Sequence, residues 1–217
     1  MAHDERPVSA QALHRDGDEA HTDFSRLFAL SDGLFAIVLT LLALDLRVPD
    51  HLPAGDLKAE LLQLSPKLLG YLVTFVVVGV YWVLHHRLFE MIVRHRLGLL
   101  YLNLGFLLCV SLLPFTESLT DVDRDFELAW TLYALNLASL GMAQLTILFY
   151  ANRRSLLHHH LSGAELRRVV VRALGGPIVF LSSIAVVHID PDLAPWMPLL
   201  LIPYLRLVGR RPRGARA

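Results

Sequence analysis

Six long apolar segments separated by short polar breaks dominate the pattern of residues along this chain. A helix needs about 20 mostly apolar residues to cross a bilayer, and these segments approach or exceed that length. The pattern predicts an all-α, polytopic membrane protein with six transmembrane helices. We expect the helices at residues 24–46, 66–89, 97–118, 127–151, 166–188 and 192–208.

Residues typical of turns and helix starts lie between the apolar segments. The acidic run Asp121–Asp125 separates the third segment from the fourth. Ser162 followed by Glu165 matches a capping box, in which each side chain bonds the backbone N–H of the other residue, and predicts where the fifth helix begins. Pro198 and Pro203 make the sixth helix the weakest, because proline lacks an N–H and interrupts helical hydrogen bonding.

Basic residues are distributed unevenly between the two sides of the six segments. Cytoplasmic loops of membrane proteins carry an excess of lysine and arginine. If both termini are cytoplasmic, 16 of the 20 basic residues fall on the inside. We therefore expect a multi-pass protein of the cell membrane with its N- and C-termini in the cytoplasm. The basic residues left outside are Arg47, Lys58, Lys67 and Arg124.

The composition fits a membrane domain with little chain left over. Only 18% of the 217 residues are charged, against about a quarter in soluble domains. We expect residues 1–23 to form a polar, disordered cytoplasmic tail, residues 24–208 the six-helix membrane domain, and residues 209–217 a basic cytoplasmic tail. Cys109 is the single cysteine, so no intrachain disulfide can form.

The first apolar segment has one face that is almost wholly apolar. We call this face the first-helix stripe. At about 100° per residue, its members fall within about 60° of Ile37, and Asp32 lies roughly opposite. Such a face is ordinary lipid-facing or packing surface in most membrane helices, and a pore wall is the alternative interpretation. The stripe comprises Leu30, Gly33, Ile37, Thr40, Leu41 and Leu44.

Asp32 places a carboxylate inside the first membrane helix, where an ionisable group is costly and needs a partner. Because the second helix runs back across the membrane, its inner half lies at the same depth as Asp32. There His85 shares one helix face with Tyr81, and His86 shares the adjacent face with Trp82, each at i, i+4 spacing. We expect Asp32 to form a hydrogen bond with one of these histidines.

Three further residues can support this bond. Trp82 offers an indole N–H, Ser31 offers a hydroxyl, and Arg26 lies just below on the same helix. The resulting network is either a structural clamp between two helices or a part of the functional mechanism.

Two motifs in these helices carry a family resemblance. The first helix contains Arg26-Leu-Phe-Ala-Leu-Ser-Asp32, and the second contains Tyr81-Trp-Val-Leu-His-His-Arg87. Both are similar to motifs in prokaryotic members of the transmembrane protein 175 family of potassium channels, whose signature is Arg-x-x-x-Phe-Ser-Asp. Leu30 stands where the family usually has Phe. The six-helix layout extends the resemblance over residues 24–208.

The resemblance implies a leak-type, potassium-permeable channel. It also implies a homotetramer whose first helices line a central pore that lacks a Thr-Val-Gly-Tyr-Gly filter. The residues carried over to the constriction are Ile37, Leu41 and Leu44, with Thr40 adding a ring of hydroxyls. Asp45 forms a carboxylate ring at the outer mouth or, alternatively, pairs with Arg47. The expected partners are other copies of the chain, membrane lipids and potassium ions, with no cofactor and no nucleic acid.

Two other functions stay open on the residues alone. A metal-binding or redox enzyme would use Asp32, His85 and His86 as ligands, and a proton-coupled carrier would relay protons through Asp32 and His85. The chain contains no nucleotide-binding loop, no Gly-x-Ser-x-Gly and no His-Glu-x-x-His motif, so we do not expect an enzyme. The apolar stripe favours a channel over a carrier, whose cavity needs polar side chains.

Overall fold

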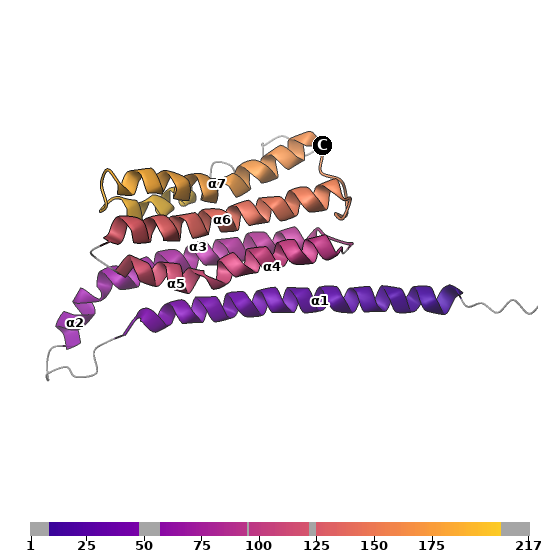
Figure 1. Ribbon diagram of the computed structural model, residues 1–217, viewed down its shortest axis with the longest axis horizontal. Coiled ribbons are helices and arrows are strands. Elements are labelled where there is room, and N and C mark those ends of the chain that lie inside the picture. Colours follow the sequence, from indigo (N-terminus) through magenta and orange to yellow (C-terminus); the bar gives the residue numbers. More distant parts are fainter. Residues whose placement is uncertain (1–8, 48–56, 95, 122–124, 205–217) are drawn as a thin grey trace, which may run out of the picture.

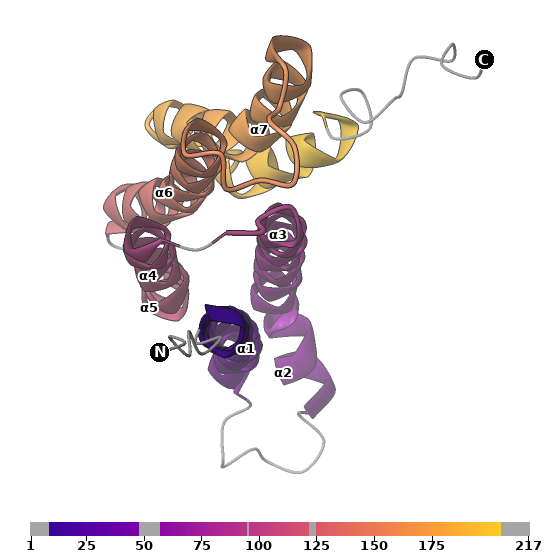
Figure 2. The same cartoon turned by 90° about the vertical axis from the view of Figure 1, so that its right-hand side faces the viewer.

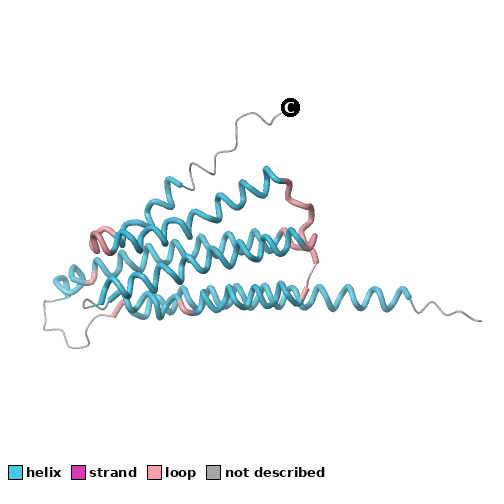
Figure 3. Tube along the Cα trace, turned by 45° about the horizontal axis from the view of Figure 1, so that its top comes forward, coloured by secondary structure: helices cyan, strands magenta, loops and turns pink. Residues whose placement is uncertain are grey.

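The computed structural model describes residues 9–47, 57–94, 96–121 and 125–204 (Figure 1). This part of the chain is a helical bundle without a strand element, as predicted (Figure 3). Its α-helices are α1 (Ser9–Leu42), α2 (Leu57–Gln63), α3 (Ser65–Glu90), α4 (Leu97–Ser111), α5 (Leu113–Ser118), α6 (Phe126–Arg153) and α7 (Gly163–Val187). The 3₁₀ helices are η1 (Ala43–Asp45), η2 (Leu119–Asp121) and η4 (Ala194–Leu200).

Four helical stretches in the described residues are long and apolar enough to cross a membrane, which confirms the second to fifth predicted segments. They are Ser65–Glu90, Leu97–Asp121, Phe126–Arg153 and Gly163–Val187. The sixth segment is described only to residue 204, and it consists of η4 and one further helical turn. The count of six spans therefore stays a prediction.

Helix α1 begins much earlier than the hydropathy predicts. It starts at Ser9 rather than at residue 24, so residues 9–23 are helical where we expected disorder. Residues 10–13 are good helix formers (Ala-Gln-Ala-Leu), and lengthening an existing helix avoids the cost of a new nucleus. In Figure 1, α1 runs well past the other helices at its N-terminal end. Residues 1–8 lie outside the described part.

The third predicted helix is interrupted. Helix α4 ends at Ser111 and α5 starts at Leu113, with Pro114 in its first turn. Proline has no N–H to bond the preceding turn, so the break falls directly before it. The fifth helix begins as predicted, because Ser162 and Glu165 form the capping box at the start of α7.

Helix α6 is the centre of the bundle. In its most apolar stretch of 18 residues, 61% is buried inside the bundle, against 28–33% in the corresponding stretches of the other three spans. Two hydrogen bonds tie it to α3: the Tyr81 hydroxyl donates to the Leu137 carbonyl at 2.9 Å, and Gln144 Nε2 donates to the Tyr81 carbonyl at 2.8 Å. These contacts fix the position of α3, which in turn supports α1.

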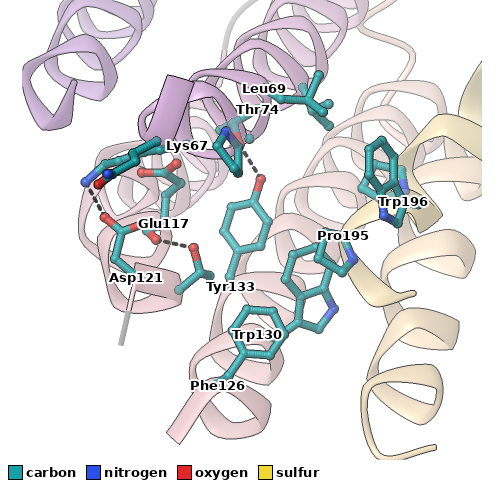
Figure 4. Close-up of a pocket in the computed structure, with 16 residues that line it drawn as sticks. Lys67, Leu69, Thr74, Glu117, Asp121, Phe126, Trp130, Tyr133, Pro195 and Trp196 are labelled. Carbon is teal, nitrogen blue, oxygen red and sulfur yellow. Dashed lines mark hydrogen bonds and ion pairs between the residues drawn. The ribbon is translucent and has the colours of Figure 1, made fainter. Parts of the chain in front are cut away.

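The two ends of the bundle differ in their connections. At one end, the segments that follow α3 and α6 pair, since Val93 N–H donates to the Leu156 carbonyl at 2.8 Å and His158 N–H donates to Met91 at 2.9 Å. At the other end, Lys67 pairs with Asp121 beside a cavity of about 480 Å³. Figure 4 shows this cavity between α3, α6 and η4, with Trp130 and Trp196 on its walls.

Candidate functional site

Helix α1 lies at one margin of the bundle, next to α3 and α4 (Figure 2). Its inward face is fully buried and consists of Ser31, Phe35, Val38 and Leu42. The opposite face is the first-helix stripe, whose large side chains are exposed although they are apolar: Ile37 is 55%, Leu41 42% and Leu44 55% exposed. Within the described chain, no other helix covers the stripe.

Thr40 is the single hydroxyl-bearing residue of the stripe. Its Oγ1 donates to the Ile37 carbonyl one turn earlier, at 2.7 Å. The hydroxyl proton is therefore used within the helix, and the side chain is exposed. The oxygen keeps an accepting lone pair on the exposed face, which can coordinate a cation or accept a hydrogen bond from a water molecule.

A buried chain of hydrogen bonds joins α1 to α4 and α3. Asn103 Nδ2 donates to Ser31 Oγ at 3.1 Å, and Ser31 Oγ donates to the Leu27 carbonyl at 3.0 Å. His85 Nε2 lies 2.8 Å from Asn103 Oδ1. Because a carbonyl oxygen only accepts, His85 donates through Nε2–H in this arrangement. The side chains of Ser31, Asn103 and His85 are buried.

Aromatic rings hold the imidazole of His85 in place. The ring stacks between Phe89, at a centroid distance of 4.3 Å, and Phe106, at 4.8 Å. Phe35 of α1 packs against both His85 and Phe106. The hydrogen-bonded side chains of Ser31, Asn103 and His85 are thus enclosed by apolar groups, which makes their hydrogen bonds costly to break.

Asp32 has a different partner from the one predicted. Trp82 Nε1 donates to Asp32 Oδ1 at 2.8 Å, so the expected support from Trp82 is present. The expected Asp–His bond is wrong for the described residues, since His85 bonds Asn103 instead. Adjacent residues on a helix point about 100° apart, so Ser31 faces the buried Asn103 while Asp32 faces Trp82 at the rim.

The remaining predicted network residues lie at the edge of this arrangement. His86 packs against Phe28 and Trp82, with centroid distances of 5.8 and 5.6 Å, and its Nε2 lies 3.4 Å from Glu90. Arg26 is exposed, and no ion pair between it and Asp32 is found in the described residues. The side chain of Asp45 lies outside the described residues, so its place at a pore mouth stays a prediction.

Asn103 is the residue of this network that we did not assign to the site. Its signal in the sequence is a carboxamide inside an otherwise apolar segment, and such side chains commonly join membrane helices. Asp32 and His85 have separate partners, and no group of three or more potential metal ligands occurs among the described residues. The arrangement fixes α1 against α3 and α4 and leaves the stripe uncovered.

Part of the chain matches the model of a known protein family. Residues 26–114 match the family described as endosomal/lysosomal potassium channel TMEM175. A protein of Streptomyces collinus named a potassium channel is 37% identical over 122 residues, which are 54% of this chain and 59% of that protein. The mouse endosomal/lysosomal proton channel TMEM175 is 30% identical over 141 residues, or 64% of this chain and 28% of the mouse protein. The matched region thus spans less than two thirds of either relative.

The fold is similar to that of a solved TMEM175 homologue. The crystal structure of a lysosomal potassium-selective channel TMEM175 homologue from Chamaesiphon minutus superimposes with a TM-score of 0.73 at 26% sequence identity. The match covers 87% of this chain and 100% of the other. The resemblance carried by the two motifs in α1 and α3 is therefore confirmed: the chain is similar to TMEM175 proteins in sequence over residues 26–114 and in fold over 87% of its length.

Proposed function

We propose that this protein is a potassium-permeable leak channel of the cell membrane, whose pore is lined by α1 of four identical subunits. The observation that carries this proposal is the first-helix stripe, an apolar face turned away from the rest of the described chain. The names of the relatives support an ion-conducting role. Conduction needs no cofactor, because ions flow down their electrochemical gradient.

Four copies of the stripe around an axis form a narrow apolar neck. Water and ions leave such a constriction when it offers them no polar partner, so small changes in its width close or open it. Ile37, Leu41 and Leu44 supply the apolar rings, and Thr40 supplies a ring of hydroxyl oxygens. Potassium loses its hydration shell more easily than sodium does, so such a neck gives modest rather than sharp selectivity.

The orientation with six spans and both termini inside is part of this proposal. Basic side chains gather at the end of the bundle where α3 ends and α7 begins, including Arg87 and Arg167. Acidic side chains such as Glu117 and Glu127 lie at the other end. This distribution is the one expected when the basic end faces the cytoplasm. Asp45 then lies near the outer mouth, where a ring of carboxylates would concentrate cations.

The proposal is tested by potassium and sodium flux from liposomes that contain the purified protein. Leu41→Ala should raise the flux or reduce the preference for potassium, because it widens the neck. Leu108→Ala is the matched control: Leu108 is an exposed leucine on α4, outside the stripe, and its loss should leave the flux unchanged. The folded, oligomeric state of each variant is checked by size-exclusion chromatography.

Two outcomes would contradict the proposal. An absence of flux from well-folded wild-type protein would exclude a leak pore. Saturable, pH-driven uptake of a small molecule would instead favour a carrier, and the separate hydrogen-bond partners of Asp32 and His85 argue against that mechanism.

A further inference from the structure

An apolar groove of about 260 Å³ runs between α3, α7 and the segment that contains η4. This groove is separate from the α1 network and adjoins the cavity of Figure 4, with which it shares the lining residues Val73 and Pro198. Its walls are aliphatic, with rim residues that are exposed on the membrane-facing surface. The exposed residues include Leu72, Val76, Leu199 and Ile202, and Leu84 is partly exposed.

The groove contains one charged side chain, that of Arg172. Arg172 is exposed, and it lies within the membrane-crossing stretch Gly163–Val187. No hydrogen bond or ion pair to Arg172 is found among the described residues. A guanidinium inside a membrane segment requires an anionic or accepting partner, and this part of the chain supplies none.

A second arginine lies on the same face of α7. Arg168 precedes Arg172 by one helical turn, at the i, i+4 spacing that aligns two side chains, and it is also exposed. Two guanidinium groups one turn apart can bind the oxygens of a phosphate, whose geometry matches the planar fork of arginine. The groove therefore has an apolar body and a cationic end.

The length of the groove is close to that of the acyl chains in one leaflet. Leu72 and Leu84 are both lining residues, and their separation of twelve positions on α3 corresponds to about 18 Å at 1.5 Å per residue. Half of a hydrocarbon core of about 30 Å is about 15 Å. Arg172 lies at the end of the groove nearer the start of α7, where Arg87 and Arg167 also lie.

We propose that this groove binds one acyl chain of an anionic phospholipid, with the lipid phosphate held by Arg172 and Arg168. In the orientation given above, the cationic end faces the cytoplasmic leaflet, which is the leaflet rich in anionic lipid. Only the choice of leaflet depends on the proposed function. Binding itself requires only that α3 and α7 lie in a membrane.

The test is native mass spectrometry of the full chain in detergent, titrated separately with phosphatidylglycerol and with phosphatidylcholine of the same acyl chains. Wild type should prefer phosphatidylglycerol by about 10-fold, the effect expected of a charge-assisted hydrogen bond. Arg172→Gln should abolish the preference, and Arg172→Lys should retain part of it. Val76→Trp should reduce the binding of both lipids by filling the groove.

Arg87→Gln is the matched control, because Arg87 is exposed at the same end of the bundle but does not line the groove. Equal losses in Arg87→Gln and Arg172→Gln would overturn the proposal, since they would indicate general attraction to a basic surface. Unchanged lipid binding in both Arg172→Gln and Val76→Trp would also overturn it.

A change in oligomeric state without a change in lipid binding for Val76→Trp would indicate that the groove is a contact between subunits, and it would overturn the proposal as well. Because binding is measured without flux, failure of the channel proposal is distinguishable from failure of this one.

Discussion

Leu41 and Leu42 are neighbours in the chain and lie in opposite surroundings: Leu41 is 42% exposed, whereas Leu42 is 1% exposed. The two side chains have the same composition and nearly the same depth. Their roles therefore differ only through the face of α1 that each occupies, which makes them a matched pair for experiments on the proposed pore.

Cysteine accessibility should separate these two faces. In a Cys109→Ser background, which removes the native thiol, Ile37→Cys and Leu41→Cys should react with a water-soluble methanethiosulfonate reagent and reduce potassium flux. Val38→Cys and Leu42→Cys should stay unmodified, because these positions are buried against the bundle. Equal modification at positions 41 and 42 would show that the stripe does not line an aqueous path.

Asn103 should affect both stability and conduction. Asn103→Leu leaves the buried Ser31 and His85 side chains without their shared partner, which should lower the free energy of unfolding by about 0.5–2 kcal/mol. It should also change potassium flux, because Ser31 is part of α1. Thermal unfolding in detergent and liposome flux measure the two effects.

Asn136→Leu is the control for that substitution. Asn136 is also a buried carboxamide, but it donates to Thr116 of α5 at 3.1 Å and does not bond α1. We expect a similar loss of stability with unchanged flux per folded channel. If both variants altered flux equally, the effect would come from loss of stability alone.

The bond between Trp82 and Asp32 should be measurable as a coupling energy. Trp82→Phe and Asp32→Ala each remove one partner of the 2.8 Å hydrogen bond. A double-mutant cycle on the free energy of unfolding should give a coupling of about 0.5–1.5 kcal/mol. Trp130→Phe removes a bond to Ser183 elsewhere in the bundle, and its effect should add to that of Asp32→Ala without coupling.

Gly141 should tolerate no side chain. A Cβ atom at this position would lie 2.5 Å from Pro177 Cγ and 2.6 Å from Cδ, both on α7. Gly141→Ala should therefore destabilise the protein by about 1–3 kcal/mol through overpacking. A Cβ at Gly79 meets no atom within 4 Å, so Gly79→Ala should be neutral or stabilising by up to about 1 kcal/mol. A lower unfolding temperature for Gly79→Ala than for Gly141→Ala would contradict this packing.

The sequence predicted those features that depend on local pattern. Apolar runs gave the helices from Ser65 to Val187, and the capping box gave the start of α7. The 100° rotation per residue placed the apolar residues of the stripe on one face of α1, and the structure shows that this face is exposed. These features follow from residues close together in the chain.

The features that were missed depend on how separate helices pack. The i, i+4 pattern placed His85 near Asp32 in depth, but it could not show that Asn103 of α4 comes between α1 and α3. Residues 9–23 are polar, but polarity does not exclude a helix. A polar segment can extend a helix that is already held in the bundle by buried residues such as Phe35 and Leu42.

The hydrogen bonds of Ser31 and Asp32 have a mechanical consequence for α1. The two residues are consecutive, and each bonds a different neighbouring helix: Ser31 bonds α4 and Asp32 bonds α3. With one such bond, α1 could still rotate about its own axis. Two bonds that point about 100° apart around the helix fix this rotation. Spinning α1 about its own axis would break at least one of them. Tilting α1 about the position of Ser31 and Asp32 would strain the two hydrogen bonds less. Changes in the width of the neck should therefore come from tilting of α1 and not from its rotation.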